Sequence, residues 1–183
     1  MAKTLAKVRF TYQDYLHMSE DKRYELVGGE FFMVPSPNEY HQRISRELGY
    51  ALLGYVKKNK SGSVYYAPFD VVFSDKDVVQ PDIVYVSKER KNIITKDNIQ
   101  GAPDLIVEII SPKTGYRDRE IKRKLYFKYG VKEFWIVDPA KQTIEVLTLT
   151  KNGYKTEKLY PADAVLYSPL LKGLEIDLNL VFS

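Results

Sequence analysis

The chain has 183 residues, enough to bury a substantial core, and its 44% hydrophobic and 28% charged residues are typical of a globular protein rather than a disordered or fibrous one. It has no cysteine, which excludes disulfides, thiol catalysis and cysteine zinc sites, and it has no apolar run long enough for a membrane helix, so we expect one cytoplasmic domain over 1–183. The net charge of +4 favours a polyanionic partner, and an ordinary lysine-rich surface explains it equally well.

The N-terminal half is predicted to combine short strands with one long helix. A helical turn over 11–18 is followed by a hairpin, because Gly28-Gly29 between two apolar runs is a hairpin-turn signal. From 39 to 58 the apolar residues recur every three or four positions, which predicts an amphipathic helix packed on a sheet. The strands expected in this half are 23–27, 30–34, 63–66, 69–74 and 82–87, with a turn at 75–77.

The C-terminal half is predicted to contain a strand–helix–strand unit. The strand 104–111 is followed by a helix over 116–129, which Gly130 ends, and then by the strand 133–138. The two strands of such a unit run parallel with a right-handed crossover. The remaining expectations are a polar segment without regular structure over 88–102, a hairpin of strands 143–150 and 154–159 through Asn152-Gly153, and an irregular tail from 161 onward.

Glu108 is the least expected residue of the predicted core. It lies within Leu-Ile-Val-Glu-Ile-Ile, a strand that is apolar on both faces and is therefore expected to be buried on both. Because an unpaired buried carboxylate is very costly, such a group is paired, protonated or bound to a metal. The alternative is an edge strand, or a glutamate near the strand end that faces solvent.

Asp82 is a second candidate, at the start of the strand that follows Gln80-Pro81. An aspartate after proline often only caps a turn, which is the alternative here. Together, Asp82 and Glu108 suggest two carboxylates on neighbouring strands. Hard divalent cations such as Mg²⁺ favour a few carboxylate ligands and keep waters for a phosphate substrate, and such a cation can activate water against a phosphodiester.

Lys122 lies on the helix that follows the Glu108 strand. Asp118, Lys122 and Tyr126 are spaced four residues apart and share one helix face. If this face looks toward the sheet, Lys122 reaches back over the Glu108 strand and orients water or stabilises developing negative charge. If it looks outward, Asp118 and Lys122 form an ordinary surface pair.

Several segments together resemble one protein family. They are Arg23-Tyr-Glu-Leu-Val-Gly-Gly-Glu30, Ala67-Pro-Phe-Asp-Val-Val72, Gln80-Pro-Asp82, Gly101-Ala-Pro-Asp-Leu-Ile-Val-Glu-Ile-Ile-Ser-Pro112, the run from Asp118 to Lys122 with Tyr126, and Gly130-Val-Lys-Glu-Phe-Trp-Ile-Val-Asp-Pro139. In this order they resemble the Uma-two family, a bacterial branch of the PD-(D/E)XK, restriction-endonuclease-like superfamily. The resemblance covers about 10–160.

The resemblance implies an α/β (α+β) fold of the restriction-endonuclease type. A four-stranded mixed central β-sheet is flanked by helices, and N- and C-terminal β-hairpins are added to it. The motif carboxylates correspond to Asp82 and Glu108, which would hold Mg²⁺ or Mn²⁺. The motif lysine is expected two residues after Glu108, where this chain has Ile110. In this branch the matching lysine is Lys122 on the following helix.

Further residues are weaker candidates for the site. Lys124 could replace Lys122, but it lies about 200° further around the helix. Glu25 and Glu30 flank the first hairpin and could add a carboxylate, although both are also typical of exposed strand ends. Gln80 and Asp70 are supporting candidates, Asp70 because it lies in an otherwise apolar strand. His17 and His41 have no metal-ligand spacing and are interpreted as ordinary.

The leading functional hypothesis is a Mg²⁺-dependent endonuclease that hydrolyses phosphodiester bonds of DNA with Asp82, Glu108 and Lys122. The alternative is a catalytically impaired nucleic-acid-binding or assembly module that keeps the nuclease fold, which the displaced lysine and the modest net charge favour. A metal hydrolase acting on a small phosphate ester is a third hypothesis. By analogy with restriction enzymes we also expect a homodimer, with a self-complementary patch at Tyr154 and Tyr160.

Overall fold

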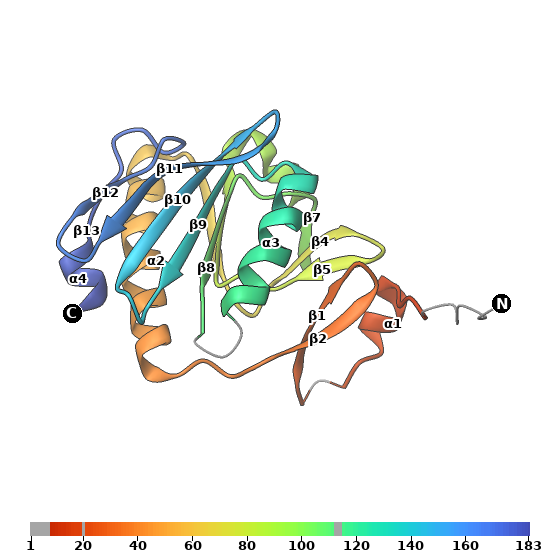
Figure 1. The fold of residues 1–183 in the computed structure, drawn as a ribbon. Helices are drawn as coiled ribbons and strands as arrows, with labels where there is room; N and C mark the ends of the chain where they lie inside the picture. The colour runs from red at the N-terminus through yellow and green to blue at the C-terminus, as the bar shows by residue number, and fades with distance from the viewer. Residues whose placement is uncertain (1–7, 20, 112–114) are drawn as a thin grey trace.

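The computed structural model describes residues 8–19, 21–111 and 115–183, except for the side chains of 116–118. Its centre is a six-stranded mixed sheet in the order β11-β10-β9-β8-β6-β3 (Figure 1). In it β8 and β9 run parallel, and the other neighbouring strands run antiparallel. The strands are β3 (Gly62–Tyr66), β6 (Ile83–Ser87), β8 (Leu105–Ile109), β9 (Glu133–Asp138), β10 (Thr143–Thr150) and β11 (Gly153–Pro161).

A second sheet has five strands in the order β2-β1-β5-β4-β7. Its buried residues Val71, Val79 and Ile99 share one core cluster with Ile106 of β8 and Tyr126 of the long helix α3, so this sheet packs on the same side of the large sheet as α3. The strands are β1 (Arg23–Val27), β2 (Glu30–Val34), β4 (Asp70–Ser74), β5 (Asp77–Val79) and β7 (Asn98–Gln100).

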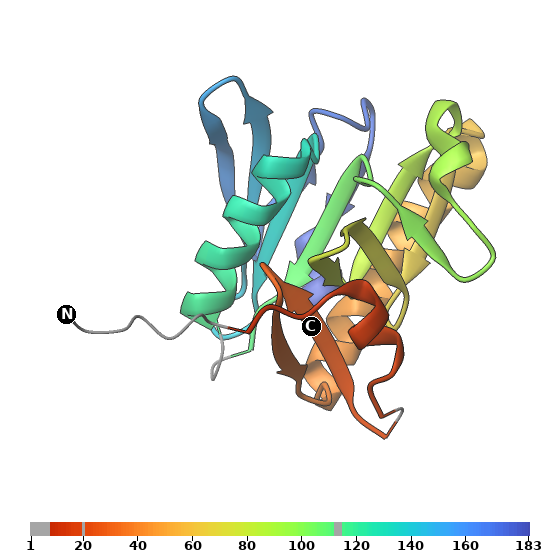
Figure 2. The same cartoon turned by 90° about the vertical axis from the view of Figure 1, so that its right-hand side faces the viewer.

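Two long helices cover opposite faces of the six-stranded sheet, α2 (Glu39–Asn59) and α3 (Gly115–Tyr129), as the turned view of Figure 2 shows. Alternate strand residues point to opposite faces, and they divide between two core clusters accordingly. Ile83 and Val107 pack with the α2 residues, whereas Val84 and Ile106 pack with the α3 residues. The short helices are α1 (Tyr12–Leu16), η1 (Lys88–Ile93) and α4 (Leu178–Phe182).

Most of the predicted elements agree with the structure to within one or two residues. The hairpin turn at Gly28 and Gly29 has φ angles of +57° and +77°, the left-handed region that glycine adopts without strain. Gly130 ends α3 with φ +79°. β8 and β9 pair in parallel through Leu105 and Glu133, as the strand–helix–strand unit predicts. The mixed sheet flanked by helices is the predicted fold class.

Two predictions about local structure were wrong. The tail after 161 contains a hairpin of β12 (Val165–Tyr167) and β13 (Glu175–Asp177), and then α4. The polar segment 88–102 contains η1 and β7. The predicted turn is present at 75–76, between β4 and β5, but β5 itself was not predicted. The missed strands have three residues each, too short for alternation to reveal them.

The predicted four-stranded mixed core corresponds to β9-β8-β6-β3, and the predicted C-terminal hairpin β10–β11 extends it beyond β9 to six strands. One broader expectation changes. Tyr154 and Tyr160 are only 9% and 5% exposed, because they pack in the core clusters of their own chain. They cannot form the self-complementary patch predicted for them. Among the described helices, none combines the length and apolar character needed to span a membrane.

Candidate active site

The side chain of Glu108 lies under α3, on the face of the large sheet that this helix covers. Its backbone pairs with Ile136 of β9. The Tyr126 hydroxyl donates a hydrogen bond of 2.5 Å to Glu108 Oε1, and the Lys122 ammonium lies 3.0 Å from the same oxygen. The Glu108 side chain is only 11% exposed. Its charge is compensated by direct partners, as a buried carboxylate requires.

The electrostatic environment of this group is unusual. Burial raises the pKa of Glu108 to about 7; Lys122 opposes this shift, and the carboxylates of Asp82 and Glu25 add to it. Burial by itself would lower the pKa of Lys122, but Glu108 and Glu25 raise it above its ordinary value. Burial and the nearby Glu108 also raise the pKa of Tyr126. At neutral pH, Lys122 and Tyr126 therefore remain proton donors, while Glu108 lies near its midpoint.

Asp82 lies directly before β6, at the same end of the sheet as Glu108. The β6–β8 ladder pairs Ile83 with Val107, so the next opposed positions are Asp82 and Glu108. Asp82 Oδ2 accepts a hydrogen bond of 2.8 Å from the backbone N–H of Ile109, which anchors the carboxylate to β8. The Asp82 side chain is 18% exposed, slightly more than that of Glu108. The two carboxylates thus lie at one end of the sheet, Glu108 on β8 and Asp82 directly before the neighbouring β6, and Asp82 is the more accessible.

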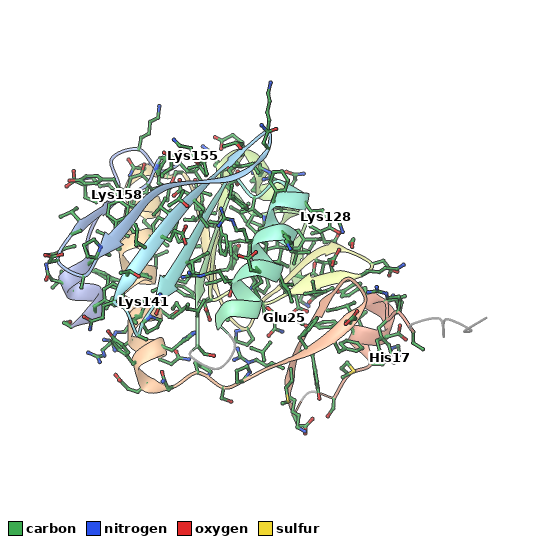
Figure 3. The ribbon with its side chains drawn as sticks, in the orientation of Figure 1. His17, Glu25, Lys128, Lys141, Lys155 and Lys158 are labelled. Carbon is green, nitrogen blue, oxygen red and sulfur yellow. The ribbon has the colours of Figure 1, made fainter. Side chains whose placement is uncertain are left out.

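Glu25 joins this cluster from β1 of the second sheet (Figure 3). Its Oε1 lies 2.9 Å from the Lys122 ammonium and accepts a hydrogen bond of 3.0 Å from the backbone N–H of Gln80. Lys122 therefore bridges two carboxylates, one from each sheet, and its side chain is only 13% exposed. The sequence signal for Glu25 is its place beside the first hairpin, and nothing local indicates its partner.

Gln80 and Asp70 form a second layer of polar contacts behind Glu25. Gln80 Nε2 donates hydrogen bonds to Asp70 Oδ1 at 2.8 Å and to the Tyr15 hydroxyl at 3.2 Å. The Tyr15 hydroxyl also donates to Asp70 Oδ1, at 2.8 Å. Asp70 is thus linked to the site through Gln80 rather than by contact with Glu108, and α1 takes part through Tyr15.

His41 was interpreted as an ordinary histidine, but it is the partner of Asp82. Its Nε2 lies 3.3 Å from Asp82 Oδ1, and its side chain is 17% exposed. Burial would lower the pKa of His41, but the contact with Asp82 outweighs this and raises it. The two residues are far apart in sequence and in different elements, so no motif spacing could have revealed the pair.

Two supporting candidates, Glu30 and Lys124, lie outside the cluster, and the third, Asp118, is not tested. Glu30 forms an ion pair of 3.2 Å with Arg9 at the first hairpin. Lys124 is exposed on α3, away from Glu108. Asp118 lies in α3, but its side chain is outside the described residues.

The donor set fits a hard divalent cation. Glu25, Asp82 and Glu108 bring three carboxylates to one end of the sheet, whereas Lys122 is their single lysine partner in the hydrogen bonds described above. Burial is the main cause of the raised pKa of Glu108, and the carboxylates of Asp82 and Glu25 add to it, so a cation bound beside them would favour the ionised form of Glu108. Within the described residues, no preformed cluster of three or more metal-ligating side chains is found. The fit is therefore to an ion that takes few protein ligands and keeps several waters, as Mg²⁺ does.

The chain shares its fold with a solved bacterial structure. That structure is titled as a putative nuclease belonging to DUF820 from Anabaena variabilis. The two align with a TM-score of 0.79 at 22% sequence identity, covering 94% of this chain and 97% of the other. No curated protein matches the chain.

A family model matches the sequence over residues 12–179, further toward the C-terminus than the 10–160 expected. It is the model of the Uma2 (Uma-two) family, described as "Putative restriction endonuclease". The match includes the strands of Glu25, Asp82 and Glu108 and the helix of Lys122. The chain therefore belongs to the Uma2 family, whose description is that of a restriction endonuclease.

Proposed function

We propose that the protein is an endonuclease that hydrolyses phosphodiester bonds of DNA with the help of Mg²⁺ or Mn²⁺. The observation that carries this proposal is the contact of the Lys122 ammonium with Glu108, 3.0 Å from its Oε1, beside Asp82 at the start of the neighbouring β6. Two carboxylates and a lysine are the groups that the family motif brings together. Here the lysine comes from α3 instead of β8.

Asp82 and Glu108 would hold the cation from the adjacent ends of β6 and β8. When bound, Mg²⁺ supplies positive charge to the phosphodiester and acidity to the attacking water. Lys122 keeps its proton and places a fixed positive charge beside Glu108, where it stabilises negative charge that develops on the phosphate oxygens. Tyr126 orients the Glu108 carboxylate by its hydrogen bond, and Glu25 holds the ammonium from the other side.

The alternative function is a nucleic-acid-binding or assembly module without cleavage. A specific observation favours it: the chain supplies partners to its own carboxylates. Lys122 contacts both Glu108 and Glu25, and His41 contacts Asp82. A site neutralised in this way would bind a cation weakly, because the cation must compete with the ammonium for Glu108.

Calorimetric titration with Mg²⁺, together with a plasmid cleavage assay, distinguishes the nuclease from the non-catalytic module. We expect the wild-type protein to bind Mg²⁺ and cut DNA, and Glu108→Ala to lose both activities. Glu30→Gln is the matched control, since it removes a carboxylate that pairs with Arg9 away from the site. Mg²⁺ binding that is equal in wild type and Glu108→Ala, with no cleavage by either, would establish the non-catalytic alternative.

A further inference from the structure

A polar cavity of about 200 Å³ opens beside Asp82, between the N-terminal half of α2, the start of β1 and the end of β3. Asp82 and His41 form one part of its wall. Arg23 of β1 and Arg46 of α2 also line it, and Tyr66 of β3 supplies an aromatic wall. This cavity therefore joins two guanidinium groups to the more accessible carboxylate of the candidate site.

We infer that this cavity binds the DNA backbone, with Arg23 and Arg46 holding a phosphate that neighbours the one to be cut at Asp82. The inference rests on the proposed DNA substrate and adds to it the place where the strand lies. A guanidinium offers donors in a planar fork that matches phosphate oxygens, and two of them on one cavity favour an anion. The Asp82 carboxylate repels an anion at its end of the cavity, so the arginines direct the phosphate to the opposite end of the cavity.

Both arginines have donors to offer. Arg23 Nη2 donates to the backbone carbonyl of Pro35 at 3.2 Å, which uses one of the five N–H groups of a guanidinium. Arg46 forms an ion pair of 2.8 Å with its neighbour Glu47, but the Arg46 side chain is 68% exposed. Exposed pairs of this kind contribute little, so a phosphate can replace Glu47 as the partner.

The ring of Tyr66 packs against α2 in the wall of the cavity. It is 40% exposed at one side, and its ring lies on Gly49 of α2. A Cβ built on Gly49 would lie only 2.2 Å from Tyr66 Cε1, so the glycine is what allows this approach. A partly exposed aromatic surface beside two arginines is suited to the sugar or base of a nucleotide whose phosphate the arginines bind.

Fluorescence anisotropy of a labelled DNA duplex, measured in EDTA over a range of salt concentrations, tests the inference without cleavage. The variants are Arg23→Gln and Arg46→Gln. The control is Lys155→Gln, which removes the same charge from a side chain that is 65% exposed and lies on β11, far from Glu25 (Figure 3). Each arginine variant should weaken binding and reduce the slope of log K against log salt by about 0.9. The control should keep the wild-type slope.

Equal slopes in wild type, both arginine variants and the control would overturn the inference, and so would a wild-type protein that binds no DNA. Arg46 is exposed on α2, so its variant keeps the test valid if Arg23→Gln fails to fold. Failure of the proposed function can be distinguished from failure of this inference. A protein that binds DNA through these arginines but cuts none contradicts nuclease activity and supports DNA binding in the cavity.

Discussion

At the scale of single residues, the centre of the candidate site is one lysine shared by two buried carboxylates. Lys122 lies 2.9 Å from Glu25 Oε1 and 3.0 Å from Glu108 Oε1. Removing one partner of a buried ion pair is destabilising, because it leaves the other charge without compensation. The same lysine is therefore important for stability and, in the proposed function, for chemistry. Its substitution should affect both, and the two effects can be measured separately.

We predict that Lys122→Met reduces DNA cleavage by about 10²–10³-fold, the usual loss when one charge-stabilising donor is removed from a transition state. Mg²⁺ affinity should not fall, because lysine is not a ligand. Unfolding by urea should show a loss of about 3 kcal/mol at neutral pH. Lys124→Met is the control on the same helix and should behave like wild type, because Lys124 is exposed. Normal cleavage by Lys122→Met together with a defect in Lys124→Met would reverse the assignment.

The raised pKa of Glu108 makes stability depend on pH. When a carboxyl group has a higher pKa in the folded than in the unfolded state, its protonated form stabilises the folded state. Its contribution is therefore present below about pH 4.5 and is lost as the pH rises through about 7. As the pH rises through this window, the unfolding free energy of wild type should fall by about 3 kcal/mol relative to that of Glu108→Gln. Denaturant unfolding at several pH values measures it, and a difference that does not vary with pH contradicts the shift.

At the scale of elements, α3 carries both partners of Glu108 on one face. Lys122 and Tyr126 are four residues apart, and the helix passes over β8 so that both reach the same carboxylate oxygen. Tyr129, three residues after Tyr126, contacts Asp77 of the second sheet instead, at 2.5 Å. The helix thus connects the two sheets through two separate buried carboxylates.

Tyr126→Phe and Tyr129→Phe form a matched pair that separates these two contacts. Each removes one hydroxyl that donates to a carboxylate, so each should lower the unfolding free energy by about 1.5–3 kcal/mol. Only Tyr126→Phe should raise the pKa of Glu108 further, because its hydroxyl favours the ionised form. NMR titration of the glutamate side chains reports that pKa. Equal effects of both variants on Glu108 would contradict a local role for Tyr126.

At the scale of the whole molecule, two sheets and two helices enclose the candidate site, but the net charge is only +4. In the proposed function, attraction to DNA would therefore come from a few placed cations rather than from a general basic surface. The homodimer remains a prediction without an assigned surface, since Tyr154 and Tyr160 are buried in their own chain. Light scattering at high protein concentration measures the oligomeric state directly.

We predict that the affinity for DNA is weak and falls steeply as salt rises, because each phosphate contact releases condensed counterions. Anisotropy titrations of one duplex at low and physiological salt are the measurement. The same titration with an uncharged ligand of similar size serves as the control. Affinity that is insensitive to salt would argue against a nucleic-acid partner and would favour an assembly role.

The sequence by itself determined the elements whose signal is local. Apolar periodicity predicts α2 and the strands of the large sheet, and glycine turns predict the first hairpin and the end of α3. It also singled out Asp82, Glu108 and Lys122 as candidate site residues, because a carboxylate within the apolar Glu108 strand is conspicuous and the resemblance to the family motif relates the three. The short strands of the C-terminal tail were missed, since three residues are too few to show alternation.

The tertiary structure decided which of these residues meet. Lys122 and Glu25 are 97 positions apart, and Asp82 and His41 belong to different elements, so no spacing in the chain relates them. Their contacts depend on which strands become neighbours and on the face of α3 that turns inward. The cavity lined by Arg23, Arg46 and Tyr66 exists only because three distant segments pack together there. Local patterns set the period of an element, whereas the partners of a buried charge are set by packing of the whole chain.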